Sequence, residues 1–131
     1  MREARTALIP TLTLFEHEGV DASFVDRILG QLGMHAAAGG EILFGTDAGY
    51  IDHYDTAREL QLMGRAGLSF DAVLASLTTA ASRRFGRGVR SGRIAAGEPA
   101  DLVVLKQDPA GDPVALSKVR ITIRGGKVIH E

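Results

Sequence analysis

The chain has 131 residues, of which 45% are hydrophobic and 24% are charged, and its formal net charge is -1. This balance is typical of a soluble folded domain and excludes an intrinsically disordered chain, while the small net charge argues against nucleic acid or an anionic membrane as a partner. The sequence contains no cysteine, which excludes disulfides and thiol chemistry and favours a cytoplasmic location. No apolar run reaches the roughly 20 residues that span a bilayer, so we expect no membrane insertion.

The N-terminal part begins with a strand, a helix and a second strand. Residues 7–15 (ALIPTLTLF) are apolar and partly β-branched, which predicts a buried strand. Asp21 starts a helix whose apolar residues recur at helical spacing until Gly39. Residues 42–45 (ILFG) form a short apolar run without polar alternation, which indicates a strand covered on both faces.

Two further helices are predicted after this strand, one over residues 56–66 and one that begins at Ser69 and runs to about residue 81. The side chains expected to face the core are Ala57, Leu60, Met63 and Gly64 in the first helix and Val73, Leu74, Leu77, Ala80 and Ala81 in the second.

The C-terminal part changes character after Gly86, where glycines mark a run of turns. Strands are predicted at 102–105, at 119–123 and at 127–129, and the pair Gly125-Gly126 predicts a hairpin between the last two. The order β-α-β-α-α followed by β-β-β indicates parallel strands with helical crossovers and then a small antiparallel sheet.

Asp47 is the first candidate functional residue, because it directly follows the strand predicted at 42–45. In parallel α/β folds the reacting groups gather at the C-terminal ends of the strands. A carboxylate at such a position can ligate a divalent metal or take a proton from metal-bound water. The alternative is structural, since an aspartate after a strand commonly caps the next helix or turn.

The four histidines lack the spacing of a metal site. His17, His35, His53 and His130 form no His-X-His pair, and no two of them lie at positions i and i+4 of a predicted helix. His17 and His53 each follow a predicted strand and are candidates for the same rim as Asp47, although loop histidines are more commonly solvated.

A local basic run is a conceivable contact for nucleic acid. It lacks interleaved aromatic residues, and the chain contains no glycine motif for phosphate binding. A solvated turn is therefore the better interpretation. The run consists of Arg83, Arg84, Arg87, Arg90 and Arg93.

Two separated blocks carry a resemblance to a known family. The first is residues 43–49 (LFGTDAG), and the second is residues 91–105 (SGRIAAGEPADLVVL), which is closed by residues 119–129. Together they resemble the C-terminal third of the amidohydrolase superfamily, in the branch of imidazolonepropionase-like and Xaa-Pro dipeptidase-like metal hydrolases. The second block is the more specific, and the similarity extends over nearly the whole chain.

The resemblance implies an α/β fold made of the last βα units of a (β/α)8 (TIM-type) barrel followed by strands of a small β-sandwich, so that the barrel is incomplete. Residues 1–88 would belong to the barrel and residues 89–131 to the flanking sandwich. Residues 7–15 and 42–46 would be its seventh and eighth strands. The implied reaction is hydrolysis of an amide C–N bond, cyclic or peptidic, by a metal-activated water.

The same resemblance implies roles for individual residues. Asp47 matches the eighth-strand aspartate, which is both the catalytic base and a ligand of zinc or another divalent metal. His53 and Tyr54, just past that strand, are candidates for the substrate-binding pocket. Asp101 matches an aspartate of the sandwich whose role is structural.

The departures from the family pattern limit what this chain can do alone. The family's first-strand His-X-His, its bridging lysine or glutamate and its fifth- and sixth-strand histidines have no counterpart, and one carboxylate cannot hold a catalytic zinc. We therefore expect a hydrolase fragment that is inactive and metal-free by itself, with a small amide or peptide as substrate of the complete enzyme. Expected partners are a missing N-terminal chain or further copies in a homo-oligomer. The alternative is a non-catalytic oligomerisation or interaction module derived from the same fold.

Overall fold

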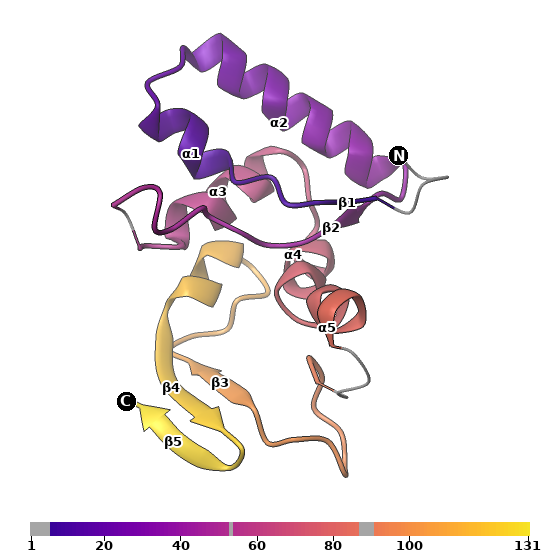
Figure 1. Cartoon of the computed structure of the whole chain (residues 1–131), viewed down its shortest axis with the longest axis vertical. Helices are drawn as coiled ribbons and strands as arrows, with labels where there is room; N and C mark the ends of the chain where they lie inside the picture. The colour runs from indigo at the N-terminus through magenta and orange to yellow at the C-terminus, as the bar shows by residue number, and fades with distance from the viewer. Residues whose placement is uncertain (1–5, 53, 87–90) are drawn as a thin grey trace.

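The computed structural model describes residues 6–52, 54–86 and 91–131, and it has a mixed α/β architecture (Figure 1). A helical part at the top of Figure 1 contains a short parallel strand pair, and an antiparallel sheet lies below it. The elements in chain order are β1 (Ala7–Leu8), α1 (Leu12–His17), α2 (Ala22–Ala37), β2 (Glu41–Ile42), α3 (Ala57–Arg65), α4 (Phe70–Leu77), α5 (Thr79–Phe85), β3 (Leu102–Leu105), the 3-10 helix η1 (Pro113–Ser117), β4 (Val119–Arg124) and β5 (Lys127–His130).

The first predicted strand is much shorter than expected, and this part of the prediction is wrong. Only Ala7–Leu8 is a strand, and residues 12–17 form helix α1. The change of direction occurs at Thr11, whose φ of 44° lies in the left-handed region. A buried carboxylate of α3 accepts hydrogen bonds from the first two amides of the new helix. It lies 46 and 47 residues away from them in sequence. The local sequence pattern predicted a strand here, because a pattern of neighbouring residues contains no information about that distant acceptor.

The strands β1 and β2 run side by side and parallel, as predicted. Leu8 pairs with Ile42, and the ladder continues past the strand end because the Leu43 amide donates to the Leu8 carbonyl at 2.9 Å. Beyond this point residues 44–46 follow without regular pairing, so the predicted strand at 42–45 is represented by Glu41–Ile42. Both strands therefore end on the same side of the pair, where Asp47 follows.

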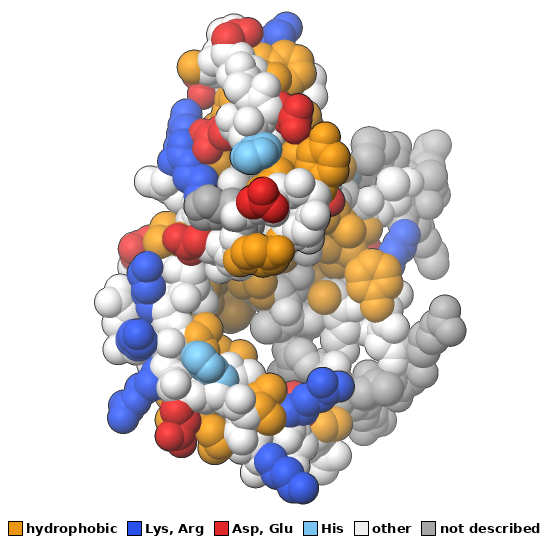
Figure 2. Space-filling view, turned by 60° about the vertical axis from the view of Figure 1, so that its left-hand side comes forward, with side chains coloured by type: hydrophobic (Ala, Val, Ile, Leu, Met, Phe, Trp, Pro, Cys, Tyr) orange, Lys and Arg blue, Asp and Glu red, His pale blue; other side chains and the backbone are white. Residues whose placement is uncertain are grey.

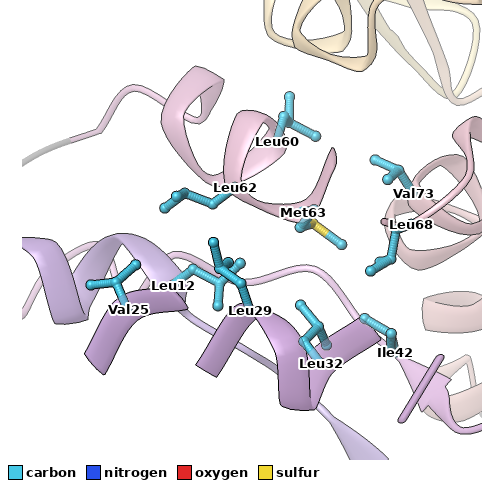
Figure 3. Packing of buried hydrophobic residues seen from close by; sticks show 10 residues of the cluster. All are labelled: Leu12, Val25, Leu29, Leu32, Ile42, Leu60, Leu62, Met63, Leu68 and Val73. Atoms are coloured by element: carbon cyan, nitrogen blue, oxygen red, sulfur yellow. The ribbon is translucent and has the colours of Figure 1, made fainter. Parts of the chain in front are cut away.

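One hydrophobic cluster holds the helical part together. Side chains from one face of α2 pack against α3 and against the start of α1, as Figure 3 shows. Full burial of a side chain of this size is worth about 1.5–3 kcal/mol, so this cluster is a main source of stability. Its buried members are Leu12, Val25, Leu29, Leu32, Ile42, Leu60, Leu62, Met63, Leu68 and Val73.

The helix predicted from Ser69 to residue 81 is two helices. The side chain of Ser69 caps α4 by accepting from the Ala72 amide, and the break comes at Thr78, whose φ and ψ of -130° and -92° are not helical. The rotation at this break leaves Leu77 exposed and buries Ala80. In α3, Gly64 is also exposed rather than on the buried side, where Glu59 and Leu62 lie instead.

The three C-terminal strands form an antiparallel sheet in the order β3-β4-β5, as the hairpin signal predicted. The 3-10 helix η1 links this sheet to the helical part, because η1 packs against α3 and buries Ala115. The predicted boundary between residues 88 and 89 lies outside the described residues. Among the helices that the structure describes, none is long and apolar enough to cross a membrane.

Candidate functional site

Asp47 lies just beyond the C-terminal end of the β1-β2 pair, and its side chain is exposed. Its φ of 59° is left-handed, a conformation that aspartate and asparagine tolerate better than most residues. The backbone before it is closely packed: a Cβ built on Gly45 would lie only 2.5 Å from Ile9 Cγ2 and 3.8 Å from Thr11 Cγ2. Glycine at this position thus allows the Asp47 segment to lie directly against the segment that leaves β1.

A tight turn follows Asp47 and fixes its backbone. The Asp47 carbonyl accepts from the amides of Tyr50 at 3.1 Å and Ile51 at 3.3 Å. Ile51 is only 1% exposed and anchors the turn in the interior. Thr46 contributes its hydroxyl, which accepts from the Ala48 amide at 3.3 Å. The turn therefore holds the Asp47 main chain in place while its carboxylate stays at the surface.

Helix α3 is not capped by Asp47. Asp55 makes the local contact at the start of that helix, because its Oδ1 accepts from the Ala57 amide at 2.8 Å. Among the described residues, no backbone amide donates to the Asp47 carboxylate. The hydrogen bonds at this rim thus give no support to the capping alternative for Asp47.

The other residues predicted for the site are arranged less favourably. Tyr54 lies on the same loop as Asp47 and is 77% exposed, whereas His53 lies outside the described residues. His17 is exposed in the last turn of α1. His35 contacts the Glu41 carbonyl through Nε2 at 3.4 Å, at the start of β2 and so at the opposite end of the strand from Asp47.

The basic run is divided among ion pairs. Arg83 and Arg84 both approach the Glu41 carboxylate, at 2.8 Å and 3.7 Å. Arg93 pairs with Glu98 at 2.8 Å. Arg87 and Arg90 lie outside the described residues. The three described arginines therefore serve as partners of nearby carboxylates. Arg83 and Arg84 lie in helix α5 rather than in the predicted turn, while the side chains of all three are partly or largely exposed.

A residue that the sequence analysis missed is Glu59, which is completely buried in α3. Its Oε1 accepts from the Leu12 amide at 2.9 Å, and its Oε2 accepts from the Thr13 amide at 2.8 Å and from the Thr13 hydroxyl at 2.6 Å. The signal was present in the sequence, because Glu59 lies three and four residues before Leu62 and Met63 on the apolar side of the helix.

Two carboxyl groups between α1 and α3 have opposite pKa shifts. Burial raises the pKa of Glu59 above its ordinary value, and the three hydrogen bonds from Leu12 and Thr13 only partly oppose this effect. The hydrogen bond from Arg58 lowers the pKa of Glu16. Arg58 donates from Nε to Glu16 Oε2 at 2.7 Å and from Nη2 to Oε1 at 2.5 Å, a two-point contact.

The family that the sequence resembles uses a divalent metal, which would need a set of protein ligands here. A protein zinc site takes three or more ligands from histidine, cysteine, aspartate or glutamate. Within residues 6–52, 54–86 and 91–131 no three such side chains are grouped to hold an ion. The described residues thus do not complete such a site.

Comparison with known proteins shows which family the chain is similar to. A model of the amidohydrolase family matches residues 28–129, which confirms the resemblance carried by the two sequence blocks. The chain is also 46% identical over 59 residues to amidohydrolase tasK of Hapsidospora irregularis, an alignment that covers 45% of this chain and 6% of that protein.

Two solved structures are similar to the present fold. A Xaa-Pro dipeptidase with methionine bound in its active site has a TM-score of 0.84 and 26% identity, over 100% of this chain and 36% of that one. A prolidase-like protein from Bifidobacterium longum has a TM-score of 0.77 and 28% identity, over 96% of this chain and 35% of that one. The chain thus spans about a third of the length of these solved relatives.

Proposed function

Because the chain belongs to the amidohydrolase family, we propose that it forms the part of a metal-dependent hydrolase that carries the Asp47 carboxylate. In this proposal β1 and β2 are the last two strands of a (β/α)8 barrel, residues 1–88 belong to that barrel, and residues 89–131 belong to a flanking β-sandwich. The complete enzyme would cleave an amide C–N bond in a small cyclic amide or a peptide.

The observation that carries this proposal is the position of Asp47. It follows a parallel strand at its C-terminal end, its carboxylate is exposed, and its main chain is held by the amides of Tyr50 and Ile51. This is the side of a parallel sheet on which reacting groups gather. Its chemistry fits a base that takes a proton from water while the water oxygen bonds to the amide carbon and the amine leaves with a proton.

The remaining metal ligands are proposed to come from polypeptide outside the described residues. A bound divalent metal would polarise the water and the amide carbonyl, and Asp47 would offer one carboxylate oxygen to it. Tyr54 and His53 are proposed to face the substrate, because Tyr54 is exposed on the loop that follows Asp47 and His53 directly precedes it in the sequence. The isolated chain would then be inactive.

Metal content of the purified chain tests this proposal, with Asp47→Asn as the matched variant. After exhaustive dialysis against buffer that contains trace zinc, elemental analysis should find far less than one metal ion per chain in the parent chain and in Asp47→Asn. Neither protein should cleave amide substrates. About one ion per chain that is lost in Asp47→Asn would keep Asp47 as a ligand but overturn the claim of an incomplete site. Stoichiometric metal that Asp47→Asn retains would overturn the role of Asp47.

A second candidate function, a non-catalytic assembly module, is favoured by the apolar exposure of the C-terminal sheet. Val103, Val128 and Ile129 are 57%, 51% and 61% exposed, and Figure 2 shows further hydrophobic side chains at the surface among charged ones. Buried apolar surface drives association. Sedimentation of the chain at several concentrations, with Val103→Ser and Ile129→Ser for comparison, should reveal a self-association that the serine variants weaken. A monomer at all concentrations would rule out the homo-oligomeric form of this function.

A further inference from the structure

We propose that Glu59 is a positioning residue for the Asp47 rim, because it holds the backbone that leaves β1 against the backbone that leads to Asp47. The inference rests on the proposed function, since only a site at Asp47 makes the placement of this rim important. It is carried by a short series of direct contacts that begins in α3 and ends two residues before Asp47.

The first contact joins α3 to the start of α1. The Glu59 carboxylate accepts two consecutive amides, those of Leu12 and Thr13, together with the Thr13 hydroxyl. Glu59 and Thr13 are both buried. If the carboxylate is removed, bulk water therefore cannot replace it as the acceptor. Glu59 therefore determines where helix α1 begins.

The second contact is at Thr11, the residue before these amides. Thr11 has a left-handed backbone, which is unfavourable for a β-branched residue. The side chain of Thr11 makes no capping hydrogen bond to the helix. The hydrogen bonds between Glu59 and the next two residues, Leu12 and Thr13, offset the cost of the left-handed conformation. Without them, an extended backbone at residues 11–13 would be the less strained arrangement, as the local sequence predicts.

The third contact joins this junction to the segment of Asp47. Gly45 lies against Ile9 and Thr11 so closely that a methyl group at its Cβ position would collide with Ile9. A change of the Thr11 backbone therefore moves the surface on which Gly45 rests. Asp47 follows Gly45 two residues later.

The outer tie between α1 and α3 provides a matched control. Glu16 and Arg58 join the same two helices through a partly exposed ion pair, but Glu16 lies near the end of α1 and its carboxylate accepts from Arg58. Glu16→Gln replaces one carboxyl group between these helices by an amide, as Glu59→Gln does, and leaves the acceptor of the Leu12 and Thr13 amides in place.

The test is NMR of the nitrogen-15 labelled, metal-free chain. In Glu59→Gln, the Leu12 and Thr13 amides should exchange with solvent at least about tenfold faster, which corresponds to about 1.4 kcal/mol of lost protection. The amide signals of residues 45–47 should shift, while those of α2 and β4 stay in place. Glu16→Gln should leave residues 11–13 and 45–47 unchanged.

Two results would overturn the inference. One is faster exchange at Leu12 and Thr13 with unchanged signals at residues 45–47, because Glu59 would then be a local cap only. The other is a uniform shift over α2 and β4, which indicates general destabilisation. If Glu59→Gln does not fold, Thr13→Val removes only the hydroxyl donor, and the signals of residues 45–47 decide the question in that variant. Since no metal is present, these readouts are independent of whether Asp47 binds one.

Discussion

The carboxylate of Glu59 receives both hydrogen-bond donors of Thr13, the amide at 2.8 Å and the hydroxyl at 2.6 Å, in the interior of the molecule. Through this contact α3 supplies the acceptor that the first turn of α1 needs, since the first amides of any helix have no partner within the helix. The contact joins the segments that follow the two parallel strands, so its loss should lower the stability of both.

Replacement of Glu59 by glutamine should cost about 2–3 kcal/mol in the free energy of unfolding. Glutamine keeps one acceptor, its carbonyl oxygen, but its NH2 group would face the N–H of Leu12 or the donors of Thr13, which are then left unpaired. An unpaired buried polar group costs about 1–3 kcal/mol. Urea titration followed by circular dichroism measures this. Glu16→Gln removes a partly exposed ion pair and should cost less than about 1 kcal/mol; equal losses in the two variants would contradict the prediction.

The pH dependence of stability should have opposite signs at these two carboxyl groups. Burial raises the pKa of Glu59 above the reference value of 4.5, so the folded state holds this proton more tightly. The contribution of Glu59 is therefore fully present below pH 4.5 and is lost as the pH rises through the folded pKa. The pKa of Glu16 is lowered from 4.5, so its contribution is present above pH 4.5 and is lost as the pH falls through the folded pKa.

Urea titrations between pH 3 and pH 8 on the parent chain and on both glutamine variants separate the two effects. The stability difference between parent and Glu59→Gln should shrink as the pH rises, whereas the difference between parent and Glu16→Gln should shrink as the pH falls. If the stability difference between the parent chain and Glu59→Gln did not depend on pH, the pKa of Glu59 would not change on folding.

Two glycines in α2 should respond oppositely to alanine. A Cβ on Gly33 would lie 2.4 Å from the Ala66 carbonyl oxygen at the end of α3, whereas a Cβ on Gly30 meets no atom within 4 Å. Gly33→Ala should therefore destabilise the chain by about 1–3 kcal/mol through overpacking. Gly30→Ala should stabilise it by about 0.5–1 kcal/mol, because alanine favours the helix. Thermal unfolding of both variants measures the difference, and a stabilising Gly33→Ala would show that α2 and α3 are not in close contact.

At Asp47 the backbone conformation predicts which substitution is conservative. The left-handed φ of 59° is accessible to asparagine, whereas alanine incurs about 1–2 kcal/mol in this region. Asp47→Asn should therefore unfold within about 0.5 kcal/mol of the parent chain, and Asp47→Ala should be measurably less stable. This makes Asp47→Asn a clean probe of the carboxylate, because it changes charge without changing the turn. Equal stability of the two variants would indicate that the turn relaxes.

Elements with a strong local signal could be predicted from sequence. The helix that begins at Asp21 has its capping side chain, which accepts from the Phe24 amide, and its apolar stripe meets the core as expected. The hairpin at Gly125-Gly126 needed positive φ at both residues, which glycine supplies and which both adopt. The position of Asp47 after a strand was also readable, because it depends only on the order of neighbouring elements.

Elements that depend on distant partners could not be read in this way. The stretch 69–81 has a continuous apolar pattern, yet the chain breaks at Thr78, and the carbonyl of Ser76 is used by the Phe44 amide at 3.3 Å. Likewise, a charged side chain such as that of Glu59 is ordinarily solvated, whereas this one is buried and accepts from three donors of α1.

The sequence by itself determined the family, the place of Asp47 beyond the end of β2, and the main strands and helices apart from α1, η1 and the break between α4 and α5. It could do so because periodicity, caps and turn residues act over a few neighbouring positions. Only the tertiary structure decided that residues 12–17 are a helix rather than the continuation of β1. The physical reason is that an apolar, β-branched segment accepts either conformation. The choice was made by a carboxylate that folding brings from α3 to the Leu12 and Thr13 amides.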